Sequence, residues 1–253
     1  MKSAQHPNWY LVIEHEIATE YAGTTLREYY TDPDVFLQTE IAVRREFHRL
    51  YGYGSPEITE VGINPFFYTV AAILGAKLTF PEDASVQVEG RVIADLSDIG
   101  RLKVPNDVSA AGYIPDLIEK YEHLLAKSAD TGIKPIFSLA NQSPLGTATV
   151  LRGTKLFEDI ITEPNAVKDL LETITETALK VISFQEAFTG VVPTGIGMDD
   201  DYGGLYSPEL YEEFNYPYMK RMYEHRDYRD RSLHTETFGR DHLQYIPRLG
   251  VTH

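Results

Sequence analysis

The feature that most constrains the fold is an alternation of short apolar runs with longer helical stretches, which begins near residue 113. Residues 135–140 form an apolar run typical of a buried strand, and residues 191–198 form a second one. Between them, residues 164–182 carry apolar side chains at helical spacing. Parallel strands joined by helical crossovers produce this rhythm, so the sequence predicts an α/β fold with a parallel sheet.

The chain length and this rhythm together favour a (β/α)8 barrel, and we predict a single domain over residues 1–253. Residues 1–60 are expected to be helical, and residues 76–105 indicate a small β-hairpin insertion, because short strand-like runs alternate there with turn residues. Only about five strands are recognisable, whereas a closed barrel needs eight. The chain also ends inside a strand-like run, residues 251–253. Either early strands are disguised or the C-terminal part of the barrel is absent, and we favour the second.

The composition excludes several classes of function. The chain has 23 Lys and Arg against 38 Asp and Glu, and its formal net charge of −15 does not suit binding to nucleic acid or to an anionic membrane. Because the chain contains no cysteine, it can form no disulfide, iron–sulfur cluster or thiolate-ligated zinc site. It has no apolar run of about 18 residues and no apolar N-terminal signal segment. We therefore expect a cytoplasmic protein that acts on a small solute or a protein partner.

Polar residues follow three of the predicted strands, at the ends where a parallel sheet carries its active groups. They are the segments that begin at Asn141, at Asp199 and at His234. If the barrel prediction holds, these three ends converge on one pocket. We take Asn141 and Tyr206 as candidate substrate-binding residues, although the aromatic stripe that contains Tyr206 is more typical of core packing.

Three consecutive aspartates, Asp199, Asp200 and Asp201, cannot all face one side of an extended chain, because consecutive side chains point in opposite directions. One or two of them would face the pocket as a general base, as a metal ligand or as a carboxylate that orients a cationic ligand. All three are candidate catalytic residues, and we favour Asp200 slightly. The alternative is a solvated turn that caps the next helix.

His234 and Glu236 are two residues apart, so in a strand their side chains would face the same side. An imidazole beside a carboxylate suits a divalent metal ion with nitrogen and oxygen ligands. A His–Glu hydrogen bond without a metal is the alternative. Two ligands do not complete a metal site, and His253, at the end of the last strand-like run, is a candidate for a third.

These motifs, taken with others, resemble the uroporphyrinogen decarboxylase superfamily, and within it the corrinoid-linked methyltransferases more than the decarboxylases. The resemblance covers roughly residues 17–253. Its segments include Ser143-Pro144-Leu145, Leu151-Arg152-Gly153 and Glu163-Pro164, and the most distinctive are residues 199–203, residues 207–214 with Pro217-Tyr218, and His234-x-Glu236 with Gly239.

The resemblance implies a TIM barrel of the uroporphyrinogen decarboxylase type, with its site at the carboxyl ends of the strands. In the methyltransferases, a zinc ion held by a His-x-Cys pair and a later Cys activates a thiol. His234 matches the family His, and Glu236 stands where the first Cys would be; this harder ligand also admits iron or manganese. The first expectation is therefore metal-dependent transfer of a methyl group between a corrinoid carrier on a partner protein and a small substrate. The superfamily often forms homodimers.

The true decarboxylases carry an arginine-rich segment near the N-terminus and a barrel aspartate that grips the porphyrinogen. The matching stretch here has one arginine, Arg27, and Asn64 stands in place of an acid. At a net charge of −15, binding of an octacarboxylate is unfavourable. The alternatives to the methyltransferase are a lyase that decarboxylates a small carboxylic acid with metal or carboxylate assistance, and a non-catalytic fragment or subunit of a split barrel. Because the family continues beyond residue 253, we expect the barrel to be incomplete at its C-terminus.

Overall fold

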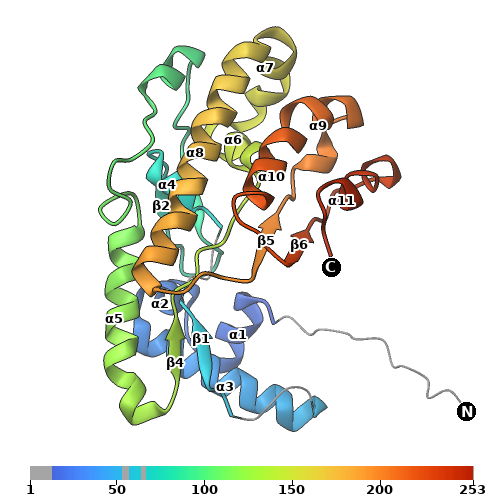
Figure 1. Ribbon diagram of the computed structural model, residues 1–253. Coiled ribbons are helices and arrows are strands. Elements are labelled where there is room, and N and C mark those ends of the chain that lie inside the picture. Colours follow the sequence, from blue (N-terminus) through green and yellow to red (C-terminus); the bar gives the residue numbers. More distant parts are fainter. Residues whose placement is uncertain (1–12, 53–56, 64–66, 253) are drawn as a thin grey trace, which may run out of the picture. The chain divides into compact units, whose positions relative to one another are not determined.

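The computed structural model describes residues 13–52, 57–63 and 67–252 (Figure 1). The chain forms two compact units. The first unit contains the residues up to Val61 together with residues 80–87 and 123–135, and the second contains the remainder. None of the described helices has the length and apolar character that a membrane span requires.

The first unit is built on three helices, α1 (His15–Ala22), α2 (Leu26–Thr31) and α3 (Pro33–Tyr51). The Asp32 carboxylate accepts the Asp34 and Val35 N–H groups at 2.8 and 3.2 Å and so caps α3. Helices α1 and α2 pack against α3, with Tyr29 and Phe36 fully buried between them.

Two short strand pairs come earlier in the sequence than the parallel pair that positions the site. Strand β1 (Glu60–Gly62) pairs with β4 (Lys134–Ile136), and β2 (Lys77–Thr79) pairs with β3 (Gln87–Glu89). The second pair falls inside the expected insertion, and an ion pair of 2.5 Å between Lys77 and Glu89 joins its strands. The intervening and following elements are α4 (Thr69–Ile73), η1 (Leu96–Arg101) and α5 (Ile114–Thr131).

The helices of the second unit follow from clear signals in the sequence. Helix α6 (Pro144–Arg152) begins where the Ser143 hydroxyl accepts the Gly146 N–H at 2.9 Å. It leads through η2 (Gly153–Lys155) and α7 (Leu156–Thr162) to the long helix α8 (Pro164–Thr189). The apolar stripe of α8 is buried against α6, α7 and α10 (Tyr216–Tyr223), as its helical spacing predicts.

The sheet that positions the site is parallel. Strand β5 (Gly195–Asp199) pairs with β6 (Asp230–His234) so that Asp199 lies opposite His234, and the two strands run side by side in Figure 1. The connection between them contains η3 (Gly203–Leu205), α9 (Pro208–Phe214) and α10 (Tyr216–Tyr223). Close approach of the strands requires glycine at position 195, because a Cβ there would lie 2.8 Å from the Asp230 carbonyl oxygen. The predicted strand–helix–strand unit is thus confirmed.

Further segments extend this sheet on both sides. The Asp199 N–H donates to the Asn141 carbonyl at 2.9 Å, and the Ser143 N–H donates to the Asp199 carbonyl at 2.8 Å. On the other side, after η4 (Arg240–His242) and α11 (Tyr245–Arg248), the Thr252 N–H donates to the Arg231 carbonyl at 2.8 Å. Thr252 therefore contacts β6, but residues 251–252 do not form a strand in the described part of the chain.

Three predicted strand boundaries are wrong. The run 135–140 is paired as a strand only up to Ile136, and the run 191–198 forms a strand only from Gly195, because Val191 and Val192 lie on the surface. Strand β6 ends at His234, two residues before a bend at Glu236. The strands of the described part of the chain do not close a barrel, and a missing C-terminal part stays a prediction.

Candidate active site

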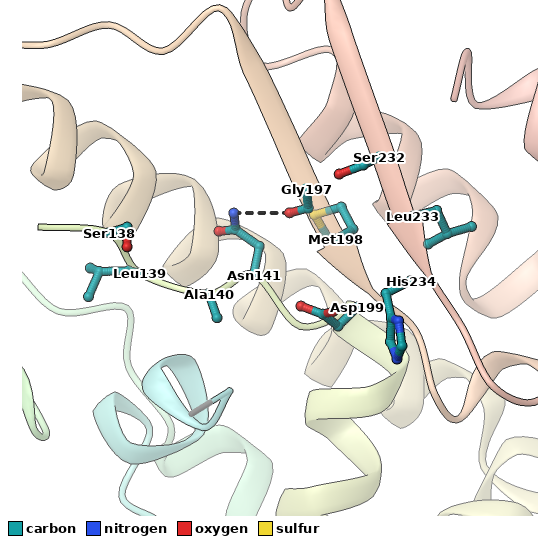
Figure 2. A pocket seen from close by; sticks show the side chains of 10 residues that line it. All are labelled: Ser138, Leu139, Ala140, Asn141, Gly197, Met198, Asp199, Ser232, Leu233 and His234. Atoms are coloured by element: carbon teal, nitrogen blue, oxygen red, sulfur yellow. Dashed lines mark hydrogen bonds between the residues drawn. The ribbon is translucent and has the colours of Figure 1, made fainter. Parts of the chain in front are cut away.

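A pocket of about 470 Å³ opens at the carboxyl ends of β5 and β6 (Figure 2). Three neighbouring segments form its walls, residues 138–141, 197–199 and 232–234. Its volume is in the range of small-molecule sites. Two of these lining residues, Asp199 and His234, are titratable, and none of them is Lys or Arg. The convergence of three polar strand ends is therefore observed for Asn141, Asp199 and His234.

Asp199 is the aspartate that faces the pocket. Its carboxyl is partly buried, and this burial is the main reason that its pKa rises from 3.8 to about 6. The neighbouring Asp201 carboxylate raises the pKa further, whereas His234 lowers it. A carboxyl group with a pKa near 6 can both accept and donate a proton near neutral pH.

Asp201 lies beside the imidazole of His234. Its Oδ1 is 3.6 Å from His234 Nε2, a distance that allows electrostatic attraction but is too long for a hydrogen bond. This oxygen is buried and makes no hydrogen bond with the described chain. Burial raises the pKa of Asp201, His234 lowers it, and Glu236 raises it. Carboxylates and an imidazole thus share one small region at the ends of the two strands.

Asp200 points to the opposite side of β5 and is fully buried. Its Oδ1 accepts the Ser143 hydroxyl at 2.7 Å, and its Oδ2 accepts the Tyr211 hydroxyl at 3.1 Å and Asn215 Nδ2 at 2.8 Å. Burial raises its pKa to about 6, against the lowering effect of these hydrogen bonds. The preference for Asp200 as the catalytic residue is therefore corrected: Asp200 does not line the pocket, and it fixes the turn that presents Asp199 and Asp201.

The two candidate substrate-binding residues have different environments. Asn141 lines the pocket, and its Nδ2 donates to the Gly197 carbonyl at 3.3 Å, as Figure 2 shows. Tyr206 is only 3% exposed and stacks on Phe157 with ring centroids 4.9 Å apart. Its burial raises the pKa of its hydroxyl to about 12. Tyr206 is a core residue that does not line this pocket, because the aromatic stripe packs inward.

The donor set for a metal ion is incomplete in the described chain. His234 and Asp201 supply two neighbouring donor atoms, but no three His, Asp or Glu side chains of the described residues are arranged to hold a metal ion. Glu236 is exposed in a bend after β6, where the same-face rule for strands does not apply. His253 and Asn64 lie outside the described residues. A zinc, iron or manganese ion on His234 and Glu236 stays a prediction.

Several residues that shape the site were not singled out from the sequence. The Gln185 side chain of α8 accepts the Leu139 N–H at 2.8 Å and so supports the pocket wall. Asn215 lies in the break between α9 and α10 and holds Asp200. The phenol of Tyr68 lies near Asp201, and its pKa is raised by burial, by Tyr202 and by Asp201. In the sequence, a polar residue such as Asn215 among apolar helix positions could have indicated a buried hydrogen-bonding side chain.

Curated relatives of this chain are uroporphyrinogen decarboxylases. The protein from Xylella fastidiosa is 25% identical over 187 residues, which cover 71% of this chain and 50% of that protein. The one from Flavobacterium johnsoniae is 27% identical over 139 residues, which cover 52% of this chain and 38% of the relative. The chain thus spans about half the length of the Xylella protein and less than half the length of the Flavobacterium protein.

A solved structure has a similar fold. A methyltransferase from Methanosarcina mazei aligns with a TM-score of 0.67 at 17% identity, over 93% of this chain and 66% of the other. This likeness supports a fold of the TIM-barrel type. The family model for uroporphyrinogen decarboxylase (URO-D) matches residues 6–252, nearly the whole sequence. The chain therefore belongs to the uroporphyrinogen decarboxylase family.

Proposed function

We propose that the protein is an enzyme that transfers a methyl group between a corrinoid carrier on a partner protein and a small substrate, with Asp199 and His234 as its proton-transferring groups. One observation carries the proposal: Asp199, with a pKa of about 6, lies opposite His234 in a pocket of about 470 Å³. The fold likeness to the methyltransferase from Methanosarcina mazei supports it.

The proposed methyl transfer requires a base that removes a proton from the substrate. A substrate hydroxyl, amine or thiol becomes a better nucleophile as it loses its proton, and a carboxylate with a pKa near 6 is largely in its basic form at neutral pH. The carrier would supply the methyl group and keep the electron pair of the bond that breaks. The substrate–hydrogen bond breaks, a substrate–methyl bond forms, and the proton ends on Asp199. The imidazole of His234 lies opposite Asp199 and beside Asp201, and its free ring nitrogen can take the proton onward.

The lining also limits the substrate. The residues of the pocket wall include Asp199 but no Lys or Arg, so the pocket favours a neutral or cationic substrate over a polycarboxylate. The Asn141 side chain reaches the wall from the neighbouring segment and offers an amide for orienting a polar group.

A decarboxylase of a small carboxylic acid is the second candidate, because the relatives at 24–27% identity bear the name uroporphyrinogen decarboxylase. Loss of CO2 leaves an electron pair on carbon, and Asp199 in its protonated form could deliver the proton to that carbon. The absence of Lys and Arg from the residues of the pocket wall makes this candidate weaker, since they would bind the substrate carboxylate.

The test compares Asp199→Asn with Asp230→Asn, which lies at the other end of the same strand pair. With methylcobalamin as donor and a simple thiol as acceptor, loss of the base should lower kcat/KM by about 10²- to 10⁴-fold, whereas Asp230→Asn should keep the wild-type rate. The wild-type rate should rise with pH through about 6, and Asp199→Asn should lack this inflection. A wild-type rate in Asp199→Asn contradicts the proposal. Release of CO2 from small acids without methyl transfer would favour the decarboxylase instead.

A further inference from the structure

The parallel sheet has an opening beside the pocket, where residues 137–140 lie next to β5 without pairing with it. In the described chain, backbone hydrogen bonds between this segment and β5 begin at Asn141, and residues 137–140 form none with that strand. Two side chains satisfy backbone groups that a strand pair would otherwise use. The Leu139 N–H donates to Gln185 Oε1 at 2.8 Å, and Asn141 Nδ2 donates to the Gly197 carbonyl at 3.3 Å (Figure 2).

A second, smaller cavity adjoins this opening, and the proposed reaction does not use it. It encloses about 180 Å³ between the C-terminal part of α8 and strand β5. Asn141 and Gly197 line both this inner cavity and the pocket, so the hydrogen bond between them belongs to the boundary of the two spaces. Glu186 also lines the inner cavity, and its carboxylate pairs with Arg226 at 2.9 Å. Three of its other lining residues are aliphatic, namely Val181, Ile182 and Ile196.

Strand geometry explains why the Asn141 side chain lies in the opening. The Asp199 N–H donates to the Asn141 carbonyl, so Asp199 directs its backbone groups toward this segment. Gly197, two residues earlier in β5, directs its own backbone groups to the same edge. Its carbonyl therefore points into the opening, where the Asn141 amide replaces the donor that a paired strand would supply. Since glycine has no side chain, Asn141 fills the opening from one side only.

We propose that the Asn141 side chain closes this opening and so determines how long a substrate chain can be. The inference rests on the proposed placement of the reacting group at Asp199. Asp199 and Gly197 are two residues apart in β5, which is about 7 Å along the strand, so a chain of about three carbons stays in the pocket and one of about eight carbons reaches the opening. The inner cavity has room for about six groups of the size of water, which occupies about 30 Å³ in the liquid, and would accommodate the end of such a chain once Asn141 is removed.

The test is a calorimetric titration with n-propylammonium and n-octylammonium chloride at about pH 8, where Asp199 is ionised and can pair with the ammonium group. In Asn141→Ala, the end of the octyl chain should enter the inner cavity. Burial of about two further methylene groups strengthens binding about tenfold. The preference for the octyl over the propyl compound, taken as the ratio of the two Kd values, should therefore be at least about tenfold larger in the variant than in wild type.

Three controls separate an opened cavity from a loosened site. Asn141→Leu fills the opening without the hydrogen bond and should keep the wild-type ratio. Ile182→Phe, added to Asn141→Ala, fills the inner cavity and should remove the gain. Gln244→Ala removes an amide hydrogen bond to the Asp241 carbonyl, away from both cavities, and should bind both compounds like wild type.

An equal ratio in wild type and Asn141→Ala would overturn the proposal, and so would a lack of octylammonium binding by the variant. A gain that survives Ile182→Phe would place the chain elsewhere, and a gain in Asn141→Leu would assign the effect to the lost hydrogen bond; each rejects Asn141 as the closure. If urea unfolding shows that Asn141→Ala is not folded, Asn141→Ser takes its place. The titration measures binding without turnover, so a failure of methyl transfer in wild type counts against the proposed function alone.

Discussion

Replacement of Asp199 by Asn should stabilise the protein at neutral pH while it removes activity. Burial holds the pKa of this carboxyl at about 6 in the folded state, against 3.8 for an ordinary aspartate. The folded state therefore binds the proton more tightly than the unfolded state. The stability that Asp199 contributes is fully present below pH 3.8 and is lost as the pH rises through about 6.

The magnitude follows from the size of the shift. A rise of about two pKa units corresponds to about 3 kcal/mol of lost stability above pH 6. The side chain is only partly buried, so solvent screening reduces this to about 1–2 kcal/mol. An uncharged Asn of nearly the same shape has no such cost, and the variant should exceed wild type by this amount above neutral pH.

Urea unfolding between about pH 4 and pH 8 measures the difference, which should shrink toward zero at the acidic end. Asp34→Asn is a control of opposite sign. Hydrogen bonds from Lys127 and His123 lower the pKa of Asp34, so its contribution is present at neutral pH and is lost as the pH falls. Asp34→Asn should therefore be less stable than wild type at neutral pH. An Asp199→Asn variant that is less stable than wild type near pH 8, or whose difference does not vary with pH, would refute the placement of Asp199 in a desolvating site.

Two further predictions concern the frame around the site. Arg152→Ala leaves the buried Asp159, now 2.6 Å from the guanidinium, without its partner, and should cost about 3–5 kcal/mol in the free energy of unfolding. Arg248→Ala removes an exposed ion pair with Glu212 and should lower the stability far less, so similar urea midpoints for the two variants would contradict the assigned burial. Gly204→Ala places a methyl group against the Thr237 carbonyl and should lower the stability by about 1–3 kcal/mol. A wild-type melting temperature for Gly204→Ala would show that this close approach is not retained in solution.

Periodic apolar patterns predicted the largest features of the fold. The buried stripe of α8 and the parallel pair formed by β5 and β6 follow from spacing that any helix or strand of this kind must have. Strand boundaries were less predictable. Val191 and Val192 are apolar but exposed, and hydrophobicity alone does not show that the strand begins only at Gly195.

The site was predictable to the level of segments rather than of single side chains. The alternation rule correctly excluded that all three aspartates face the pocket, but Asp200, which we favoured slightly, does not line it. Ile196 and Met198 are the buried, apolar positions of β5, and a period of two places Asp200 on their side. This signal was present in the sequence. The end of β6 at His234 was not, because the bend that follows at Glu236 contains no Gly or Pro to indicate it.

The bonds that hold Asp200 also matter for redesign of the pocket. The Asp200 carboxylate accepts hydrogen bonds from Ser143, Tyr211 and Asn215 on the side of β5 that faces away from the pocket. The direction of the following turn therefore does not depend on the side chains at positions 199 and 201. These two positions can therefore be varied as a pair while the backbone between them stays in place. A small library of substitutions at Asp199 and Asp201 would change the charge and hydrogen-bonding character of the pocket without a search for compensating changes in the fold.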